Sequence, residues 1–165
     1  MKKAMIIMCL SLLCASCFIH KGQFTNGQCH PKNPNFKLLK IPLKKTDNLI
    51  FNKVYIADNI TKATGYGFLS DGRLICFNTD DGFALKEENV IGKNWNTAIA
   101  VGYWRFEENK FKIEFFVCQD GGFYNMKQGE IKGDTIIFER DCGTSNPFKT
   151  VKCPEKYILS DLSFE

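Results

Sequence analysis

The chain has 165 residues, of which 44% are hydrophobic and 24% are charged, and its formal net charge is +4. This composition excludes a disordered or low-complexity chain and is typical of one globular domain. The near balance of charges, without basic residues interleaved among the aromatic ones, excludes a nucleic-acid-binding protein.

The N-terminus has the pattern of a secretory signal. A basic start, Met1-Lys2-Lys3, precedes an apolar run from Ala4 to Leu13. A run of this length forms about 15 Å of helix, half the thickness of a membrane core, so it is too short to span a bilayer. It matches instead the apolar segment of a signal peptide, which is removed from the mature protein.

The segment that ends this run, Leu13-Cys14-Ala15-Ser16-Cys17, resembles the signal of bacterial lipoproteins. The resemblance implies a signal peptide over residues 1–16 and lipidation of Cys17 by diacylglycerol and an amide-linked acyl chain such as palmitate. We therefore expect a protein of the bacterial cell envelope that is anchored to a membrane. The acidic cluster that follows this cysteine in some Bacteroidetes-like surface lipoproteins is missing, which favours the periplasmic face. The alternative is a plain secretory signal cut near Ser16.

Five cysteines remain beyond residue 17, and an oxidising envelope favours their pairing. Cys142 and Cys153 enclose a short loop, and we expect a disulfide between them that stabilises the fold by roughly 3 kcal/mol. The partners of Cys29, Cys76 and Cys118 stay open. Cys76 and Cys118 lie in expected strands, where either is compatible with a buried free thiol. Cys29 stands beside a histidine, but no second pair at ligand spacing supports a metal site or a reactive thiol there.

Residues 17–46 are predicted to be the lipidated cysteine and a flexible tether, because proline, lysine and an asparagine-glycine pair recur there with few apolar residues. A β-rich domain is expected over residues 47–165. Apolar, β-branched and aromatic runs separated by turn residues predict strands near residues 49–51, 54–56, 66–69, 74–77, 98–106, 111–118, 123–126, 135–138 and 157–159. Residues 86–97 are the least β-like, and we expect a short helix or a lid-like loop there.

These runs predict an all-β fold built as an antiparallel meander. Residues 111–117 alternate apolar and charged side chains, and Asp71-Gly72 has the residue types of a hairpin turn. No amphipathic helix separates the runs, which excludes a parallel α/β sheet. Such a meander buries one face either as a small β-barrel or as a barrel-like sandwich.

Residues 65–75, with the sequence GYGFLSDGRLI between Gly65 and Ile75, resemble the hairpin of lipocalin-like bacterial lipoproteins, and residues 101–104, 110–116 and 129–137 continue the same rhythm. The resemblance implies a calycin-type barrel whose interior cavity holds a small apolar ligand. Aromatic side chains either line such a cavity or fill the barrel completely. The residues expected in this role are Tyr103, Trp104, Phe111, Phe115 and Phe123.

The sequence contains none of the common catalytic, phosphate-binding or metal-binding motifs, so we expect no enzyme activity, cofactor or metal. Glu114 is expected in solvent, and the arginines are expected to pair with turn acids at the barrel rim or to orient a carboxylate ligand. The expected function is binding of a small apolar ligand. The alternative is a protein-interaction module, such as an envelope assembly factor or an immunity-type lipoprotein, with a filled barrel and an exposed aromatic patch of Trp95, Phe116 and Tyr124.

Overall fold

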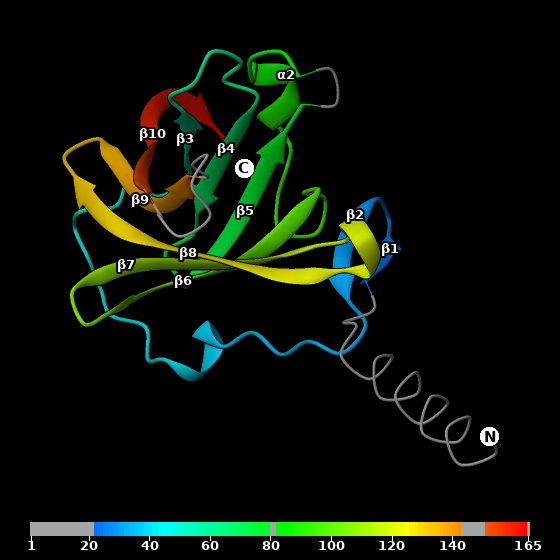
Figure 1. Ribbon diagram of the computed structural model, residues 1–165. Helices are drawn as coiled ribbons and strands as arrows, with labels where there is room; N and C mark the ends of the chain where they lie inside the picture. The colour runs from blue at the N-terminus through cyan, green and yellow to red at the C-terminus, as the bar shows by residue number, and fades with distance from the viewer. Residues whose placement is uncertain (1–21, 80–81, 143–150, 165) are drawn as a thin grey trace, which may run out of the picture.

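The computed structural model describes residues 22–79, 82–142 and 151–164, apart from the side chains of Asp141, Cys142 and Val151 (Figure 1). Its strands are β1 (Gly22–Thr25), β2 (Gln28–Pro31), β3 (Lys53–Ala57), β4 (Thr64–Phe68), β5 (Arg73–Asn78), β6 (Ala100–Glu107), β7 (Lys110–Val117), β8 (Phe123–Lys132), β9 (Thr135–Cys142) and β10 (Val151–Ser163). Short helical segments are η2 (Leu38–Lys40), α2 (Glu87–Val90) and η3 (Gln119–Gly121). Over these residues, none of the helices has the length and apolar character needed to cross a membrane.

Strands β3 to β10 form a closed barrel in which each strand pairs antiparallel with the next one in the chain. The last strand returns to the first, where Tyr157 lies opposite Ala57 and Leu159 lies opposite Tyr55. The predicted all-β meander is confirmed, and this closure shows that it forms a barrel and not a sandwich. An eight-stranded barrel has an interior just wide enough to be filled by side chains or to hold one small ligand.

Aromatic rings fill one end of the barrel interior. The indole of Trp104 stacks on Phe51 with ring centres 5.8 Å apart, and the rings of Phe111 and Phe138 stack at 6.1 Å. Trp104, Phe111 and Phe138 are at most 1% exposed, and each such ring contributes roughly 2–3 kcal/mol by leaving water. The indole N–H of Trp104 donates to the carbonyl of Leu69 at 2.9 Å, so its polar group is satisfied in this apolar end.

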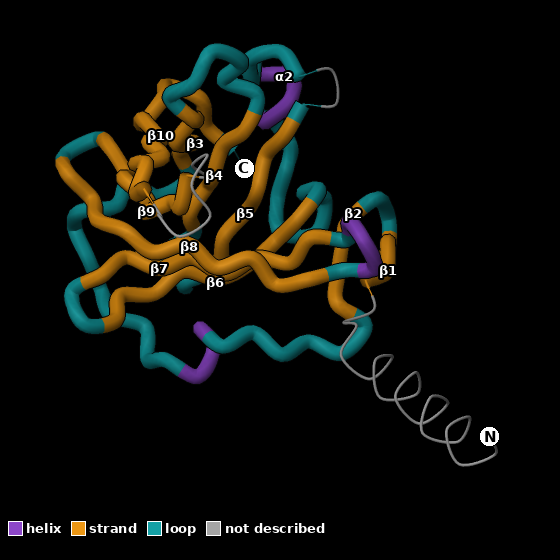
Figure 2. The backbone as a smooth tube through the Cα atoms, in the orientation of Figure 1, coloured by secondary structure: helices purple, strands orange, loops and turns teal. Residues whose placement is uncertain are grey.

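The outer face of β3 to β6 carries a second core, which α2 and the C-terminal residues cover (Figure 2). Val54 and Ile75 project outward from their strands and pack in one cluster with Val90 of α2 and with Phe164. Phe164 lies directly against Gly67, and a Cβ atom at position 67 would collide with its ring. Glycine is therefore required on β4 for the C-terminus to reach this face.

The segment before the barrel differs from the flexible tether expected over residues 17–46. Strand β2 forms a hairpin with β1 and makes a parallel bridge to the barrel between Cys29 and Ala100. A disulfide joins Cys29 to Cys118, with the Cα atoms 5.7 Å apart. Phe36 and Leu38 are 7% and 1% exposed. Residues 28–40 are thus held against the outer face of β6 to β8, because that face carries aromatic side chains that need cover.

Two charged side chains satisfy the backbone of this segment. Glu114, expected in solvent, is 1% exposed, and its carboxylate accepts the N–H of Leu38 at 2.8 Å. The guanidinium of Arg105, expected to pair with an acid, donates instead to the carbonyls of Ile41 and Gly72 at 2.9 Å and 3.0 Å. Buried backbone groups need partners, and these two side chains supply them at Leu38 and Ile41, beyond the bridge between β2 and β6.

Replacing both Cys29 and Cys118 by serine is expected to lower the free energy of unfolding by about 4 kcal/mol. The disulfide closes a loop with a sequence separation of 89, and its loss returns conformational freedom to the unfolded chain. Urea unfolding of protein secreted into an oxidising compartment measures the change. Cys76→Ala, which removes a thiol without opening a loop, is the control and should cost about 1 kcal/mol. If the Cys29→Ser, Cys118→Ser double variant were as stable as the wild type, the stabilising role given to this disulfide, called here the clamp, would be wrong.

Candidate functional site

The other end of the barrel interior is polar. Lys127 of β8 lies opposite Ile113, and Glu155 of β10 lies opposite Phe138. Ile113 and Phe138 belong to the inner core, and opposite residues share a face of the sheet, so both charged side chains enter the barrel. Two tyrosines of the inner core join them, and the four residues are called here the mouth cluster: Tyr66, Lys127, Glu155 and Tyr157. Their strands β4, β8 and β10 lie around the barrel in Figure 1.

Polar contacts tie the mouth cluster together. The ammonium group of Lys127 lies 2.6 Å from Oε2 of Glu155 and donates to the hydroxyl of Tyr157 at 3.3 Å. The Tyr157 hydroxyl in turn donates to Oε1 of Glu155 at 2.8 Å. The Glu155 carboxylate therefore accepts hydrogen bonds from both Lys127 and Tyr157. The ammonium group of Lys127 lies between this carboxylate and the Tyr157 hydroxyl.

Aromatic faces surround the same ammonium group. Its nitrogen lies 5.4 Å from the ring centre of Tyr157, 5.6 Å from that of Tyr66 and 5.8 Å from that of Phe138, within the range of cation–π attraction. The side chains of Lys127 and Glu155 nevertheless keep 18% and 27% of their exposure. Solvent therefore reaches this end of the interior, whereas the end around Trp104 is dry.

Burial and the ion pair set the protonation states of this end. Burial alone would raise the pKa of Glu155, but the hydrogen bond and charge of Lys127 and the hydroxyl of Tyr157 outweigh it and lower that pKa. Burial raises the pKa of both Tyr157 and Tyr66, so both hydroxyls stay neutral donors. Burial also raises the pKa of the Cys76 thiol to about 12, against the opposing charge of Lys127. A thiol with that pKa is not a nucleophile at neutral pH.

The aromatic residues expected to line a cavity, Tyr103, Trp104, Phe111, Phe115 and Phe123, do not form one lining. Trp104, Phe111 and Phe115 lie in the inner core and are at most 8% exposed. Tyr103 points outward, because side chains alternate along β6, and packs on Trp95. Phe123 is 42% exposed at the start of β8. Trp104, Phe111 and Phe115 fill the barrel interior. Among the described residues, the polar surface that solvent reaches inside the barrel is that of the mouth cluster.

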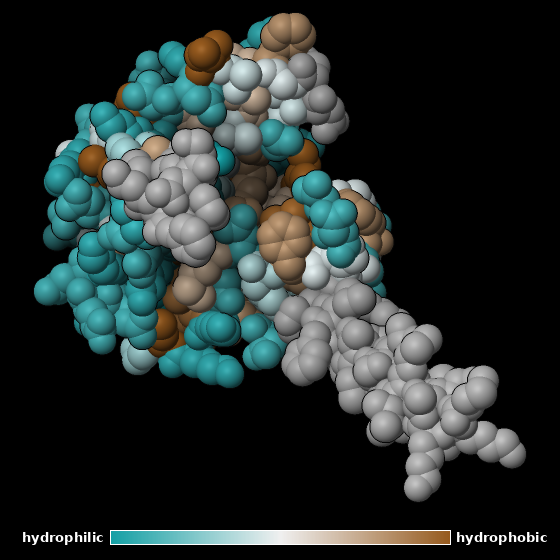
Figure 3. Space-filling model, in the orientation of Figure 1, coloured by the Kyte–Doolittle hydropathy of each residue, from teal (hydrophilic) through white to brown (hydrophobic). Residues whose placement is uncertain are grey.

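The exposed patch expected for a protein partner is also absent in that form. Phe116 and Tyr124 do lie outside the barrel, but Phe116 is fully buried with Cys29 and Phe36, and Phe36 meets the ring of Tyr124 at 5.0 Å. The segment that was expected to be a tether covers them. The large apolar side chains that are exposed come from separate elements and include Phe24, Ile60, Phe83, Ile91 and Met126. Figure 3 shows one face of the molecule, which is largely hydrophilic and has apolar side chains in a recess near its middle.

The structure describes the side chains of four of the cysteines expected in the mature protein, namely Cys29, Cys76, Cys118 and Cys153. Cys29 and Cys118 are paired, which leaves no thiol of Cys29 for a metal or a reaction, and Cys76 is free. Cys153 is disulfide-bonded, while the side chain of Cys142, its expected partner, lies outside the described part of the structure. Cys17, the expected lipidation site, lies outside the described residues as well.

Sequence reasoning missed Lys127 and Glu155 because the expected strands were too short. Residues 123–126 and 157–159 were expected to be strands, but β8 runs to Lys132 and β10 begins at Val151. Two signals were present: Glu155 stands two residues before Tyr157, and Lys127 stands two before Gly129 and four before Ile131. Each charge therefore has the phase of the inward side chains of its strand.

The chain has no match among known proteins from which a function could be inferred. No protein-family model, no curated protein and no solved structure matches the chain. The eight-stranded antiparallel barrel is compatible with the lipocalin-like fold expected from the sequence, through its meander order and its closure between β3 and β10.

Replacing Glu155 by glutamine is expected to remove a pH-dependent part of the stability. The pKa of Glu155 in the folded protein is below its usual value of 4.5. The charged pair therefore stabilises the fold fully above pH 4.5, and this stabilisation is lost as the pH falls through the folded pKa. The free energy of unfolding of the wild type should exceed that of Glu155→Gln by about 1 kcal/mol at neutral pH, and this difference should shrink as the pH falls below 4.5 through the folded pKa. Urea unfolding across this range measures it.

Glu139→Gln is the matched control, because it breaks the exposed pair of Glu139 with Lys110 outside the barrel. That variant should differ less from the wild type, and high salt should remove the difference, since exposed pairs are screened. Equal pH profiles for the two variants would contradict the role given to the mouth cluster.

Proposed function

We propose that this protein is a lipid-anchored lipoprotein of a bacterial cell envelope, and that it binds a small amphipathic anion without catalysis in the mouth of its barrel. The observation that supports the binding site is the partly solvated pair of Lys127 and Glu155, held among aromatic rings inside the barrel. An ion pair in this position adds little net stability compared with apolar side chains. A barrel that only needed filling would continue the packing found around Trp104.

The charges of the mouth favour an anionic ligand. Arg140 stands two residues after Phe138 on β9, and its charge contributes to the lowered pKa of Glu155. Among the described side chains that act on this end, the two cations Lys127 and Arg140 face the one carboxylate of Glu155, which gives an excess of positive charge. A carboxylate or sulfonate would compete with Glu155 for Lys127, while the rings of Tyr66 and the other core residues offer an apolar surface to the rest of the ligand. The un-ionised Cys76 thiol supports binding over catalysis.

The anchor part of the proposal is supported by residues 13–17, which resemble a lipoprotein signal. Lipidation by two or more acyl chains gives stable membrane attachment where a single chain is marginal. The first described strand, β1, starts at Gly22, so cleavage before Cys17 removes no described residue. The missing acidic cluster after Cys17 favours the periplasmic face of the membrane.

Cys17→Ser is expected to release the protein from the membrane into the soluble envelope fraction. The mature wild type, measured by intact mass, should begin at Cys17 and carry a diacylglycerol and a further acyl chain. Cys14→Ser, which changes the neighbouring cysteine of the signal, should leave both the mass and the attachment unchanged. A mature wild type with an unmodified Cys17 would contradict the anchor.

Lys127→Gln is expected to weaken the binding of 8-anilinonaphthalene-1-sulfonate, an aromatic anion, by roughly tenfold to a hundredfold. The variant keeps a polar side chain but removes the charge, and a charge-assisted hydrogen bond contributes about 1.5–3 kcal/mol. Fluorescence titration of a chain that starts at residue 18, secreted with a plain signal, measures the affinity.

Lys110→Gln is the control, because it removes a lysine that pairs with Glu139 outside the barrel. The wild type and this control should bind the dye equally. Equal binding by Lys127→Gln would contradict the site in the mouth. Native mass spectrometry of the same chains then shows whether the wild type retains a small molecule that Lys127→Gln loses.

A further inference from the structure

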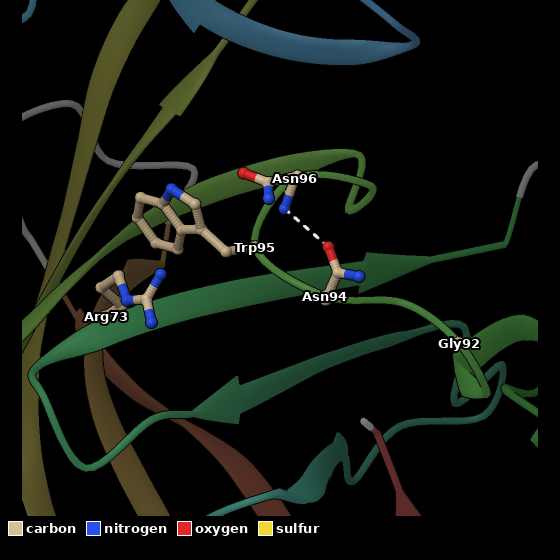
Figure 4. Close-up of a pocket in the computed structure, with 5 residues that line it drawn as sticks. All are labelled: Arg73, Gly92, Asn94, Trp95 and Asn96. Atoms are coloured by element: carbon tan, nitrogen blue, oxygen red, sulfur yellow. Dashed lines mark hydrogen bonds between the residues drawn. The ribbon is translucent and has the colours of Figure 1, made fainter.

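A pocket of about 380 Å³ lies on the outside of the barrel, between β5 and the loop at residues 91–97 (Figure 4). Its lining residues are Arg73, Gly92, Asn94, Trp95 and Asn96. Leu74, which follows Arg73 on β5, belongs to the inner core, so Arg73 projects to the opposite side of the sheet from the mouth cluster. The two sites are therefore on different surfaces of the barrel wall.

The position of Arg73 is fixed by two contacts. Its Nε donates to Oδ2 of Asp71 at 2.7 Å, and its guanidinium carbon lies 5.2 Å from the ring centre of Trp95. The side chain remains 38% exposed. Asp71 takes the Nε–H and balances the charge of the arginine. Among the described residues no hydrogen bond occupies the other guanidinium nitrogens, so they can donate to a bound molecule.

The loop that carries Trp95 is held in place before any ligand arrives. The carbonyl of Trp95 accepts from the side-chain amide of Gln28 at 2.5 Å, and its ring packs against Tyr103 with centres 5.5 Å apart. Oδ1 of Asn94 accepts the backbone N–H of Asn96 at 2.9 Å, the bond drawn in Figure 4. This leaves the amide NH₂ of Asn94 as a donor, and a fixed loop lowers the entropic cost of binding.

We propose that this pocket binds a neutral saccharide ring. A pyranose has an apolar C–H face and a rim of hydroxyls, and the pocket combines an indole ring with two side-chain amides and a guanidinium. The Arg73–Asp71 pair has no net charge, which favours a neutral ligand over a strongly anionic one. The polar lining of amides and arginine gives little surface to a lipid chain.

The test is a titration with N,N′,N″-triacetylchitotriose, a neutral trisaccharide, followed by tryptophan fluorescence. Trp104 is 1% exposed, so a change in emission reports on Trp95. We expect a saturable change with a dissociation constant of about 1 mM. Arg73→Gln and Asn96→Ala should each weaken binding by at least about fivefold, because each removes hydrogen-bond donors at the surface without touching the core.

Asn33→Ala, which removes an exposed amide outside the pocket, and Lys127→Gln, which alters the mouth, should both bind the trisaccharide like the wild type. Circular dichroism of all four variants checks that each of them is folded. No saturable change with the wild type at about ten times the expected constant would overturn the proposal. Equal binding by Arg73→Gln, Asn96→Ala and the wild type would overturn it as well. Either result leaves the anion site in the mouth unaffected, because Lys127→Gln tests that site separately.

Discussion

The pairing of β10 with β3 is the contact on which the rest of the structure depends. It joins the last strand to the first one of the barrel, with Ile158 opposite Ile56, and so removes both free edges of the sheet. The same strand places Glu155 and Tyr157 inside the barrel and then, past a shift in register after Leu159, leads to Phe164 on the outer face. Closure, the polar mouth and the outer core are therefore consequences of one strand.

The two ends of the interior differ because their energetics differ. Around Trp104 the gain comes from removing rings from water, and full burial maximises it. Around Lys127 the gain comes from an ion pair and from cation–π contacts of about 0.5–2 kcal/mol each. Complete dehydration of the pair would cost several kcal/mol per ion, so this end is favourable only while water, or a ligand that replaces water, reaches it. The partial exposure of Lys127 and Glu155 fits that requirement.

The sequence was informative where a pattern is local and silent where burial depends on distant residues. The alternation through Phe111, Ile113 and Phe115 and the turn at Asp71-Gly72 predict strands of the barrel correctly, since both follow from backbone geometry. The sequence did not predict the full length of β8 and β10, because the charged residues Lys127 and Glu155 at inward positions resemble residues at the ends of strands. The cover over the outer face did not follow either, since burial of Glu114 depends on residues 38–41, which are far from it in the chain.

The clamp at Cys29 also bears on how a lipid anchor at Cys17 would act. The two positions are twelve steps apart along the chain, and an extended chain spans at most about 3.5 Å per step, so Cys29 would stay within about 40 Å of Cys17. A free tether up to residue 46 would allow more than twice that distance. The disulfide to Cys118 and the bond from Leu38 to Glu114 shorten the reach by fixing residues 28–40 to the barrel wall. In the proposed lipoprotein, the attachment of residues 28–40 to the barrel wall thus holds the barrel near the membrane surface.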